Sequence, residues 1–177
     1  KDGVVSGLVK EFYQDGVFSG ECNFVDGQKQ GVLKKFHRNG NLNIVQTLEK
    51  GKKSGESKKF YPDGSPMSLE YYDPPDIKHG EHKYWYNDGQ LKSRSMYEHG
   101  TKVGEFIQYF ANGQLATKCV YDKSGYLHGN AKIWFLSGGL NKDYNAIHGK
   151  RHGSYKEWKE DGSIAIDCVY ENGKVKI

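Results

Sequence analysis

Residues 80–104 have the sequence GEHKYWYNDGQLKSRSMYEHGTKVG, and this stretch decides the fold. Its centre is Asp88-Gly89, with an aromatic run at 84–86 on one side and Leu91 and Tyr97 on the other. Asp-Gly or Asn-Gly between such segments is the strongest short signal for a β-hairpin, because both residues tolerate the positive φ of a type I′ turn. The stretch therefore predicts one hairpin with arms of ordinary strand length.

The same arrangement recurs along the chain with intervals of 24 or 25 residues, which predicts a tandem array. The first glycine column is Gly7, Gly31, Gly55, Gly80, Gly104, Gly129 and Gly153. The second is Gly16, Gly40, Gly64, Gly89, Gly113, Gly138 and Gly162, and the third is Gly3, Gly27, Gly51, Gly100, Gly125, Gly149 and Gly173. The predicted repeats lie near 7–30, 31–54, 55–79, 80–103, 104–128, 129–152 and 153–177, with residues 1–6 as the tail of a preceding or capping repeat.

The glycine spacing excludes helices, because no segment runs ten residues without a turn signal. We therefore expect an all-β fold, an elongated single-layer antiparallel sheet of about 14 strands in one repeat array. The copies of 25 residues carry their extra residue in the turns at 73–76 and 122–125. The first of these turns, with Pro74-Pro75, is either a bend in the sheet or a tolerated loop insertion.

A two-residue turn fixes the expected register: Tyr13 faces Phe18, Phe12 faces Ser19, and Lys10 faces Glu21. The more apolar face then carries Val9, Tyr13, Phe18, Cys22 and Phe24 in the first copy, and Phe106, Phe110, Leu115, Cys119 and Tyr121 in the fifth. The other face carries an aromatic column of Phe12, Phe36, Phe60, Trp85, Tyr109, Trp134 and Trp158. Beside it runs a lysine column of Lys10, Lys34, Lys58, Lys83, Lys132 and Lys156, with Ile107 in the fifth copy.

These columns resemble MORN repeats, and in particular their longer bacterial variant. The segment from Gly80 to Leu91, continuing to Tyr97 and Gly100, carries the resemblance most fully. The resemblance implies a non-catalytic repeat module in an elongated sheet, and it carries the label antitoxin-like or immunity-like. It also implies peripheral binding to acidic phospholipid membranes as an alternative.

Cysteine and histidine positions follow the repeat rather than a site. Cys22, Cys119 and Cys168 share one column, and even two repeats span about 19 Å, far beyond disulfide reach. The histidines also occupy repeat columns, and no cysteine lies near enough to complete a zinc site. No nucleophile elbow, phosphate loop or dinucleotide fingerprint occurs. We expect no enzyme, no catalytic residue, no metal site and no cofactor.

The remaining candidate is a binding surface, which we call the aromatic–lysine stripe: Phe12, Phe36, Phe60, Trp85, Tyr109, Trp134, Trp158, Lys34, Lys58, Lys83, Lys132 and Lys156. It could receive a peptide, an acidic headgroup or a sugar, or its aromatics could only shield the backbone. The net charge of +4 falls short of a nucleic-acid-binding signature.

The leading hypothesis is a protein-binding or scaffold module. The alternatives are binding to acidic phospholipid membranes and an exported, adhesin-like or carbohydrate-binding array. Exposed edge strands could also pair with a second copy of the chain. Three unpaired cysteines favour a reducing, cytoplasmic compartment, and export stays open because the natural N-terminus is not visible.

Overall fold

The computed structural model describes residues 3–176, and within them every regular element is a β-strand. The chain divides into two compact units, residues 1–89 and 90–177, which are described separately. The first unit contains β1 (Gly7–Phe12), β2 (Phe18–Val25), β3 (Gln28–Phe36), β4 (Leu42–Glu49), β5 (Lys52–Phe60), β6 (Pro66–Asp73), β7 (Ile77–Lys78) and β8 (Gly80–Trp85). The second contains β9 (Leu91–Glu98), β10 (Thr101–Tyr109), β11 (Leu115–Tyr121), β12 (Gly129–Trp134), β13 (Leu140–Ile147), β14 (Lys150–Trp158), β15 (Ile164–Glu171) and β16 (Lys174–Val175).

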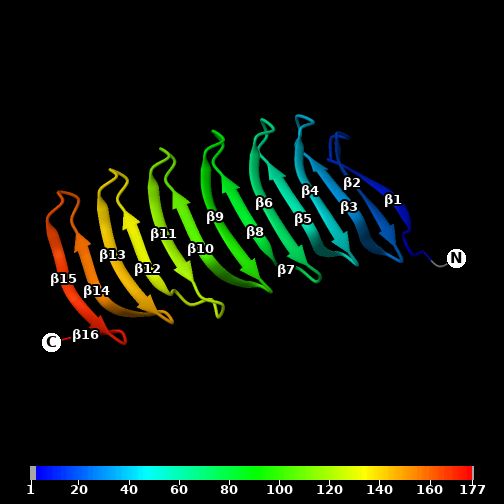
Figure 1. Ribbon diagram of the computed structural model, residues 1–177. Helices are drawn as coiled ribbons and strands as arrows, with labels where there is room; N and C mark the ends of the chain where they lie inside the picture. The colour runs from blue at the N-terminus through cyan, green and yellow to red at the C-terminus, as the bar shows by residue number, and fades with distance from the viewer. Residues whose placement is uncertain (1–2, 177) are drawn as a thin grey trace. The chain divides into compact units, whose positions relative to one another are not determined.

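The strands pair antiparallel with their neighbours in the chain, except that β7 and β8 both pair with β6 (Figure 1). The sheet is open, with β1 and β16 at the ends of the strand order, so the expected all-β fold of tandem hairpins is confirmed. Residues 3–176 form sixteen strands instead of the expected 14 or so, because two strands of two residues each, β7 and β16, are added. The start of the predicted tail at 1–6 and the final Ile177 lie outside the described residues.

The hairpin turns differ from the predicted type I′ geometry. In the turn after β1, Gly16 has a φ of 84°, whereas Asp15 is not among the residues with positive φ. The amide of Tyr13 donates to Val17 O, and that of Gly16 donates to Tyr13 O. These are the bonds of a longer loop that ends in a left-handed residue and is followed by a bulge. Two-residue turns with positive φ at both positions occur instead at the return turns, as at His148-Gly149.

The longer loop shifts the register near each turn. Phe12 pairs with Phe18, so the predicted pairs Phe12–Ser19 and Tyr13–Phe18 are wrong. A bulge between Glu11 and Phe12 absorbs one residue, and the predicted pair Lys10–Glu21 is restored beyond it. Phe12 and Phe18 consequently lie on one face, with ring centroids 5.7 Å apart.

The first glycine column stands inside strands or at their starts rather than in turns. Gly153, within β14, has a φ of 80° and lies where the register with β13 shifts between Tyr144 and Ala146. The left-handed conformation at this irregularity favours glycine, because a Cβ there crowds the adjacent carbonyl. The spacing of this glycine column therefore indicates where the strand backbone is left-handed and irregular, rather than where the chain turns.

Most buried side chains lie on the face that the sequence assigned to the cysteine column, and in the second unit they include Cys119, Ala131, Ala146 and Tyr155. Ile107, in the lysine column of the other face, is also buried. In the first unit the same face also buries polar groups: Gln46, Ser57, Glu70 and His82. His82 is fully buried, and its Nε2 lies 2.9 Å from Tyr71 O. Burial lowers the pKa of His82, which keeps the imidazole neutral near neutral pH.

We predict that Gly153→Ala lowers the free energy of unfolding by about 1 kcal/mol, because alanine disfavours the left-handed backbone at φ 80°. An added Cβ would meet nothing within 4 Å, so strain rather than a clash is tested. Gly139→Ala is the matched control, since Gly139 lacks the positive φ and has room for a methyl group. Urea denaturation measures both variants; equal midpoints would contradict the assignment of strain to Gly153.

Candidate functional site

Each aromatic residue of the aromatic–lysine stripe is the last residue of its strand, directly before a hairpin turn. The strands of the first unit place Phe12, Phe36, Phe60 and Trp85, and those of the second place Tyr109, Trp134 and Trp158. In six of these hairpins, the residue paired with the stripe aromatic on the neighbouring strand is apolar. The pairs are Phe12–Phe18, Phe36–Leu42, Phe60–Pro66, Tyr109–Leu115, Trp134–Leu140 and Trp158–Ile164. The bulge thus moves Phe18 and Leu115 to the stripe, a correction to their predicted face.

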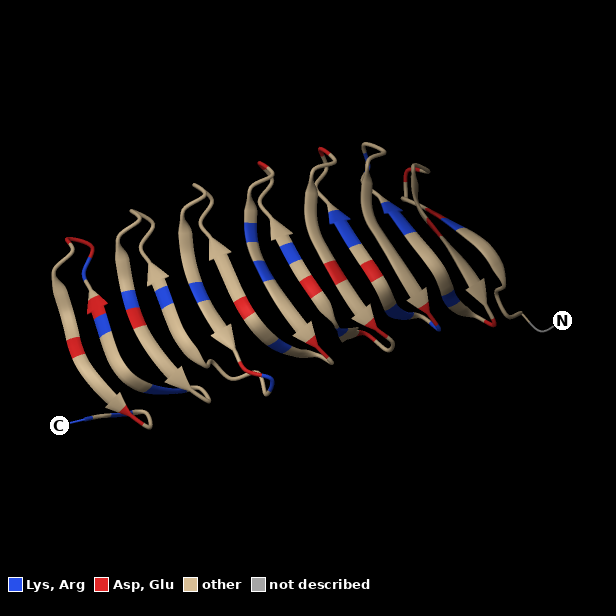
Figure 2. Cartoon of the chain, viewed as in Figure 1, with Lys and Arg blue, Asp and Glu red and all other residues tan. Residues whose placement is uncertain are grey.

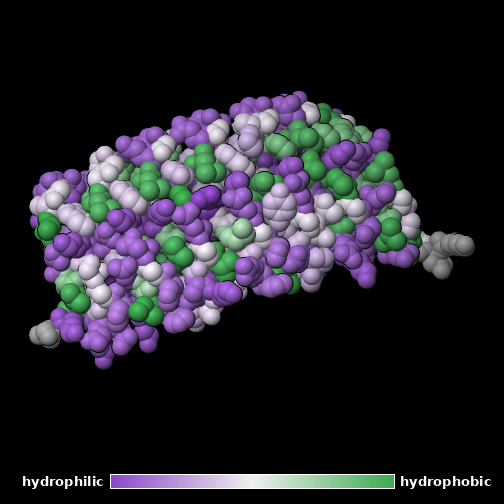
Figure 3. Space-filling view, viewed as in Figure 1, coloured by the Kyte–Doolittle hydropathy of each residue, from purple (hydrophilic) through white to green (hydrophobic). Residues whose placement is uncertain are grey.

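The stripe is partly exposed. Phe12 in the terminal strand β1 exposes 59% of its surface and Ile164 exposes 55%, whereas the other aromatics of the stripe are half-buried. Phe18 also contacts Phe36, with ring centroids 5.2 Å apart. The space-filling view shows hydrophobic side chains interspersed with hydrophilic ones on the visible face (Figure 3). The aromatics therefore pack across strands and still present apolar surface to solvent.

Positions of Lys and Arg lie next to positions of Asp and Glu on the strands (Figure 2), and five lysines of the stripe form ion pairs. The ion pairs, measured from Nζ to the carboxylate oxygen, are Lys34–Glu21 at 3.9 Å, Lys58–Glu56 at 2.7 Å, Lys83–Glu81 at 2.7 Å, Lys132–Asp143 at 3.2 Å and Lys156–Asp167 at 3.3 Å. Lys132 stands directly opposite Asp143 on the neighbouring strand, and Lys156 stands directly opposite Asp167. Partly exposed pairs add little stability, but they do neutralise much of the local positive charge.

A second set of cations lies on the opposite, more buried face, and the sequence analysis missed it. Lys29, Lys53, Lys102 and Arg151 each precede a glycine of the first column by two positions. Lys53 Nζ lies 4.5 Å from the ring centroid of Tyr72, and Lys102 Nζ lies 4.3 Å from that of Phe106. Arg151 Cζ lies 4.4 Å from that of Tyr155. Such contacts contribute about 0.5–1 kcal/mol at exposed sites. The recurrence of these four cations two positions before a glycine was the sequence signal that could have identified the set.

Burial raises the pKa of several tyrosines on this face. The pKa values of Tyr72, Tyr121 and Tyr155 rise to about 12, with loss of hydration as the largest cause. The Tyr155 hydroxyl also donates to Glu157 Oε2 at 2.5 Å, and the loss of this bond opposes ionisation further. The Arg151 charge acts in the opposite direction on Tyr155. This face consequently favours neutral tyrosine side chains under a cation.

Contacts between consecutive hairpin tips organise the edge near the stripe. The Tyr13 hydroxyl donates to Phe36 O at 2.7 Å, and the Tyr61 hydroxyl donates to Trp85 O at 2.9 Å. Arg38 also forms an ion pair with Asp15 of the preceding tip. The two tyrosine bonds fix the carbonyls of Phe36 and Trp85, so these two stripe residues are positioned by the neighbouring repeat.

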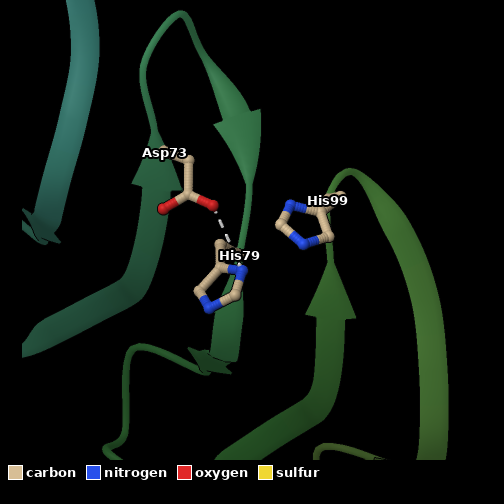
Figure 4. Close-up of side chains that lie close together, drawn as sticks. All are labelled: Asp73, His79 and His99. Atoms are coloured by element: carbon tan, nitrogen blue, oxygen red, sulfur yellow. Dashed lines mark ion pairs between the residues drawn. The ribbon is translucent and has the colours of Figure 1, made fainter.

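The return turns bring histidines and aspartates together, which the repeat columns alone did not indicate. In the second unit, Asp122, His128 and His148 place one ligand atom each within 4.8 Å of one another. Nδ1 of His148 lies 2.7 Å from Asp122 Oδ2, and Nδ1 of His128 lies 4.0 Å from the same oxygen. In the first unit, His79 Nδ1 lies 3.2 Å from Asp73 Oδ2, as the dashed line in Figure 4 shows.

The turn itself holds the Asp122 carboxylate. Oδ1 accepts hydrogen bonds from the amides of Ser124 at 2.9 Å and Tyr126 at 3.0 Å. Although burial raises the pKa of Asp122, these backbone bonds and His148 together hold it below its ordinary value. The carboxylate is therefore ionised near neutral pH, with one oxygen committed to the turn.

The cysteines remain separate. Cys22 and Cys119 are buried free thiols, and Cys168 is partly exposed. Burial raises the pKa of the Cys22 and Cys119 thiols, which disfavours the thiolate form. They pack as small residues on the buried face.

We predict that stability falls as pH rises from 10 to 12. The raised pKa values mean that the folded state favours neutral tyrosines, so their contribution is complete below the ordinary pKa of 10 and is lost as the phenols ionise near 12. Urea denaturation at each pH, followed with phenolate absorbance, measures the change. Tyr155→Phe should show a smaller loss; ionisation of every tyrosine near pH 10 in the folded protein would contradict the burial effect.

Three segments of the chain match one known repeat family. Residues 53–73, 78–99 and 102–123 match the family described as "MORN repeat variant". A search of curated proteins finds no match. Within residues 3–176, no helix is long and apolar enough to cross a membrane. The three matches are consecutive and have the hairpin period found in both units, which confirms for residues 53–123 the resemblance drawn from the glycine and aromatic columns: this part of the chain is built from MORN repeats of the variant type.

Proposed function

We propose that the chain is a non-catalytic module that binds a partner protein through the aromatic–lysine stripe. The observation that carries this proposal is the row of partly exposed aromatic and aliphatic pairs next to the hairpin turns, as in Trp134–Leu140 and Trp158–Ile164. The described residues form strands and turns alone, so they supply no second layer over this face. Aromatic side chains with a rim of charged residues are typical of protein interfaces.

The ion pairs of the stripe favour a protein partner over an acidic membrane. A membrane surface attracts each unpaired lysine by about 1 kcal/mol. Here Lys58, Lys83 and Lys132 each stand within 3.2 Å of a carboxylate, which offsets that attraction. A protein surface with apolar side chains along its centre and charges of both signs at its rim complements the stripe better.

The family supports the general class of function. MORN repeats are associated with protein or membrane binding and are typically non-catalytic modules. An antitoxin-like or immunity-like role would be one case of protein binding. In that case, the partner would be encoded beside the gene, which gives a defined set of proteins to test.

We predict that Trp134→Ser combined with Trp158→Ser weakens binding of a purified partner by roughly 30-fold, the effect of losing an interface hot spot. Candidate partners are the purified products of neighbouring genes, and calorimetry measures affinity. Tyr126→Ser is the matched control, because Tyr126 is an exposed aromatic in a return turn outside the stripe. Vesicles of acidic phospholipid form a second arm, with Lys132→Glu as the sensitive variant.

Binding of a neighbouring product that depends on Trp134 and Trp158 and not on Tyr126 supports the proposal. Three results overturn it: equal affinity of the stripe variant and the wild type, binding to none of these products, or binding to vesicles alone with loss in Lys132→Glu.

A further inference from the structure

We propose that Asp122, His128 and His148 form a binding site for a divalent transition-metal ion such as Zn²⁺. The inference is independent of the partner proposed above. It rests on the convergence of three ligand atoms, on the backbone bonds that hold their residues in place, and on one buried oxygen with lone-pair capacity left over.

The distances suit chelation after small side-chain movements. The three ligand atoms lie within 4.8 Å of one another, with His148 Nδ1 at 2.7 Å and His128 Nδ1 at 4.0 Å from Asp122 Oδ2. Ligands of a tetrahedral zinc ion lie about 3.3 Å apart, given bonds of about 2.0–2.1 Å to nitrogen and oxygen. The Asp122–His148 distance must lengthen and the Asp122–His128 distance must shorten, each by less than about 1 Å. The two histidine nitrogens, at most 4.8 Å apart, must approach by at most about 1.5 Å, and χ rotations of the exposed imidazoles supply these movements.

Asp122 Oδ2 is the atom that most indicates a ligand. It is buried and accepts no hydrogen bond of acceptable geometry from the described residues. Its closest neighbour is His148 Nδ1, at an ion-pair distance of 2.7 Å, a contact that occupies at most one of its lone pairs. An ion pair with one protonated histidine would need only one imidazole. The second ring, that of His128, has its centroid 5.4 Å from that of His148 and converges on the same oxygen.

The backbone positions all three residues in advance. Asp122 is held through Oδ1 by the amides of Ser124 and Tyr126, which leaves Oδ2 for a ligand. The amide of His128 donates to Val120 O at 2.9 Å. His148 occupies the positive-φ position before Gly149, whose amide donates to Leu127 O at 2.8 Å. That last bond joins two consecutive return turns and sets His148 beside His128.

The donor set selects the class of metal. Two imidazole nitrogens and one carboxylate oxygen suit Zn²⁺, Cu²⁺, Ni²⁺ or Fe²⁺ rather than Ca²⁺ or Mg²⁺, which prefer oxygen ligands. The His128 and His148 side chains are 49% and 67% exposed, so water can complete the coordination. The ion would join two return turns and so stabilise the second unit against unfolding.

The same residue types recur at the same spacing in the other copy of 25 residues. Asp73, His79 and His99 are separated by the same intervals, six and twenty residues, as Asp122, His128 and His148. In both copies the first histidine amide bonds the carbonyl eight positions earlier: His79 to Tyr71 O, and His128 to Val120 O. The extra residue of the longer turn thus accompanies this pattern each time it occurs.

Zinc titration of the whole chelator-treated protein, followed by calorimetry and thermal melting, tests the site. We expect His128→Ala and His148→Ala each to remove one molar equivalent of bound Zn²⁺, and Asp122→Asn to weaken that equivalent by about tenfold or more. Asp122→Asn keeps an oxygen for the Ser124 and Tyr126 amides, so the turn is preserved. Zinc at about 100 times its Kd should raise the Tm of the wild type by roughly 5 °C.

His79→Ala and His99→Ala are the matched controls, because they stand at the corresponding repeat positions and should leave the His148-dependent equivalent intact. A variant counts only if its melting without metal equals that of the wild type, and Asp122→Asn serves if the histidine variants unfold. Absence of zinc binding by the wild type overturns the proposal. So does an unchanged equivalent in His128→Ala, His148→Ala and Asp122→Asn.

Discussion

The hydrogen bond from one return turn to the preceding one is the interaction on which the rest of this structure depends. The amide of Gly51 donates to Lys29 O, that of Gly149 to Leu127 O, and that of Gly173 to Arg151 O, each at 2.8 Å. A lone hairpin is marginally stable in water, so each repeat needs its neighbours. Within each unit, these bonds join successive hairpins along the edge of the sheet that the return turns form.

The same bond organises both chemical features of that edge. Its acceptors, Lys29 and Arg151, are residues whose side chains cap aromatic rings on the buried face. The turn geometry therefore places a cationic side chain over an aromatic ring. In this way Arg151 lies over Tyr155, and the buried phenol has a positive charge close to it. At Leu127 the acceptor is apolar, and the adjacent His128 instead meets His148 and Asp122. A single repeated backbone contact thus supports a stabilising layer and, in our proposal, a metal site.

Sequence reasoning predicted the parts of the fold that periodic residue types determine. The glycine columns predicted antiparallel hairpins, and the pair Lys10–Glu21 shows that the predicted register was correct away from the turns. Near the turns it failed, because Asp15-Gly16 adopts a longer loop whose bulge absorbs one residue and moves Phe18 to the other face. Both turn types accept the Asp-Gly dipeptide, so local propensity alone does not distinguish them.

The candidate sites were predictable to different degrees. Strand alternation placed the aromatic column on one face, and Trp134 and Trp158 lie at the expected strand ends. The expectation of no metal site assigned each histidine to a column separately. Convergence of His128 and His148 on Asp122 depends on how two turns stack, a relation between repeats that residue types in one copy do not express. The signal was the shared spacing of aspartate and histidines in the two longer copies.

Amide hydrogen exchange at the return-turn glycines tests the central claim most directly. Gly51, Gly149 and Gly173 lie in exposed turns, where an unbonded amide exchanges at close to its intrinsic rate. If their amides bond the preceding repeat, NMR should find them protected to nearly the degree of the flanking strand amides. Exchange at intrinsic rates while the strands stay protected would show that the turns are independent, and it would contradict this account.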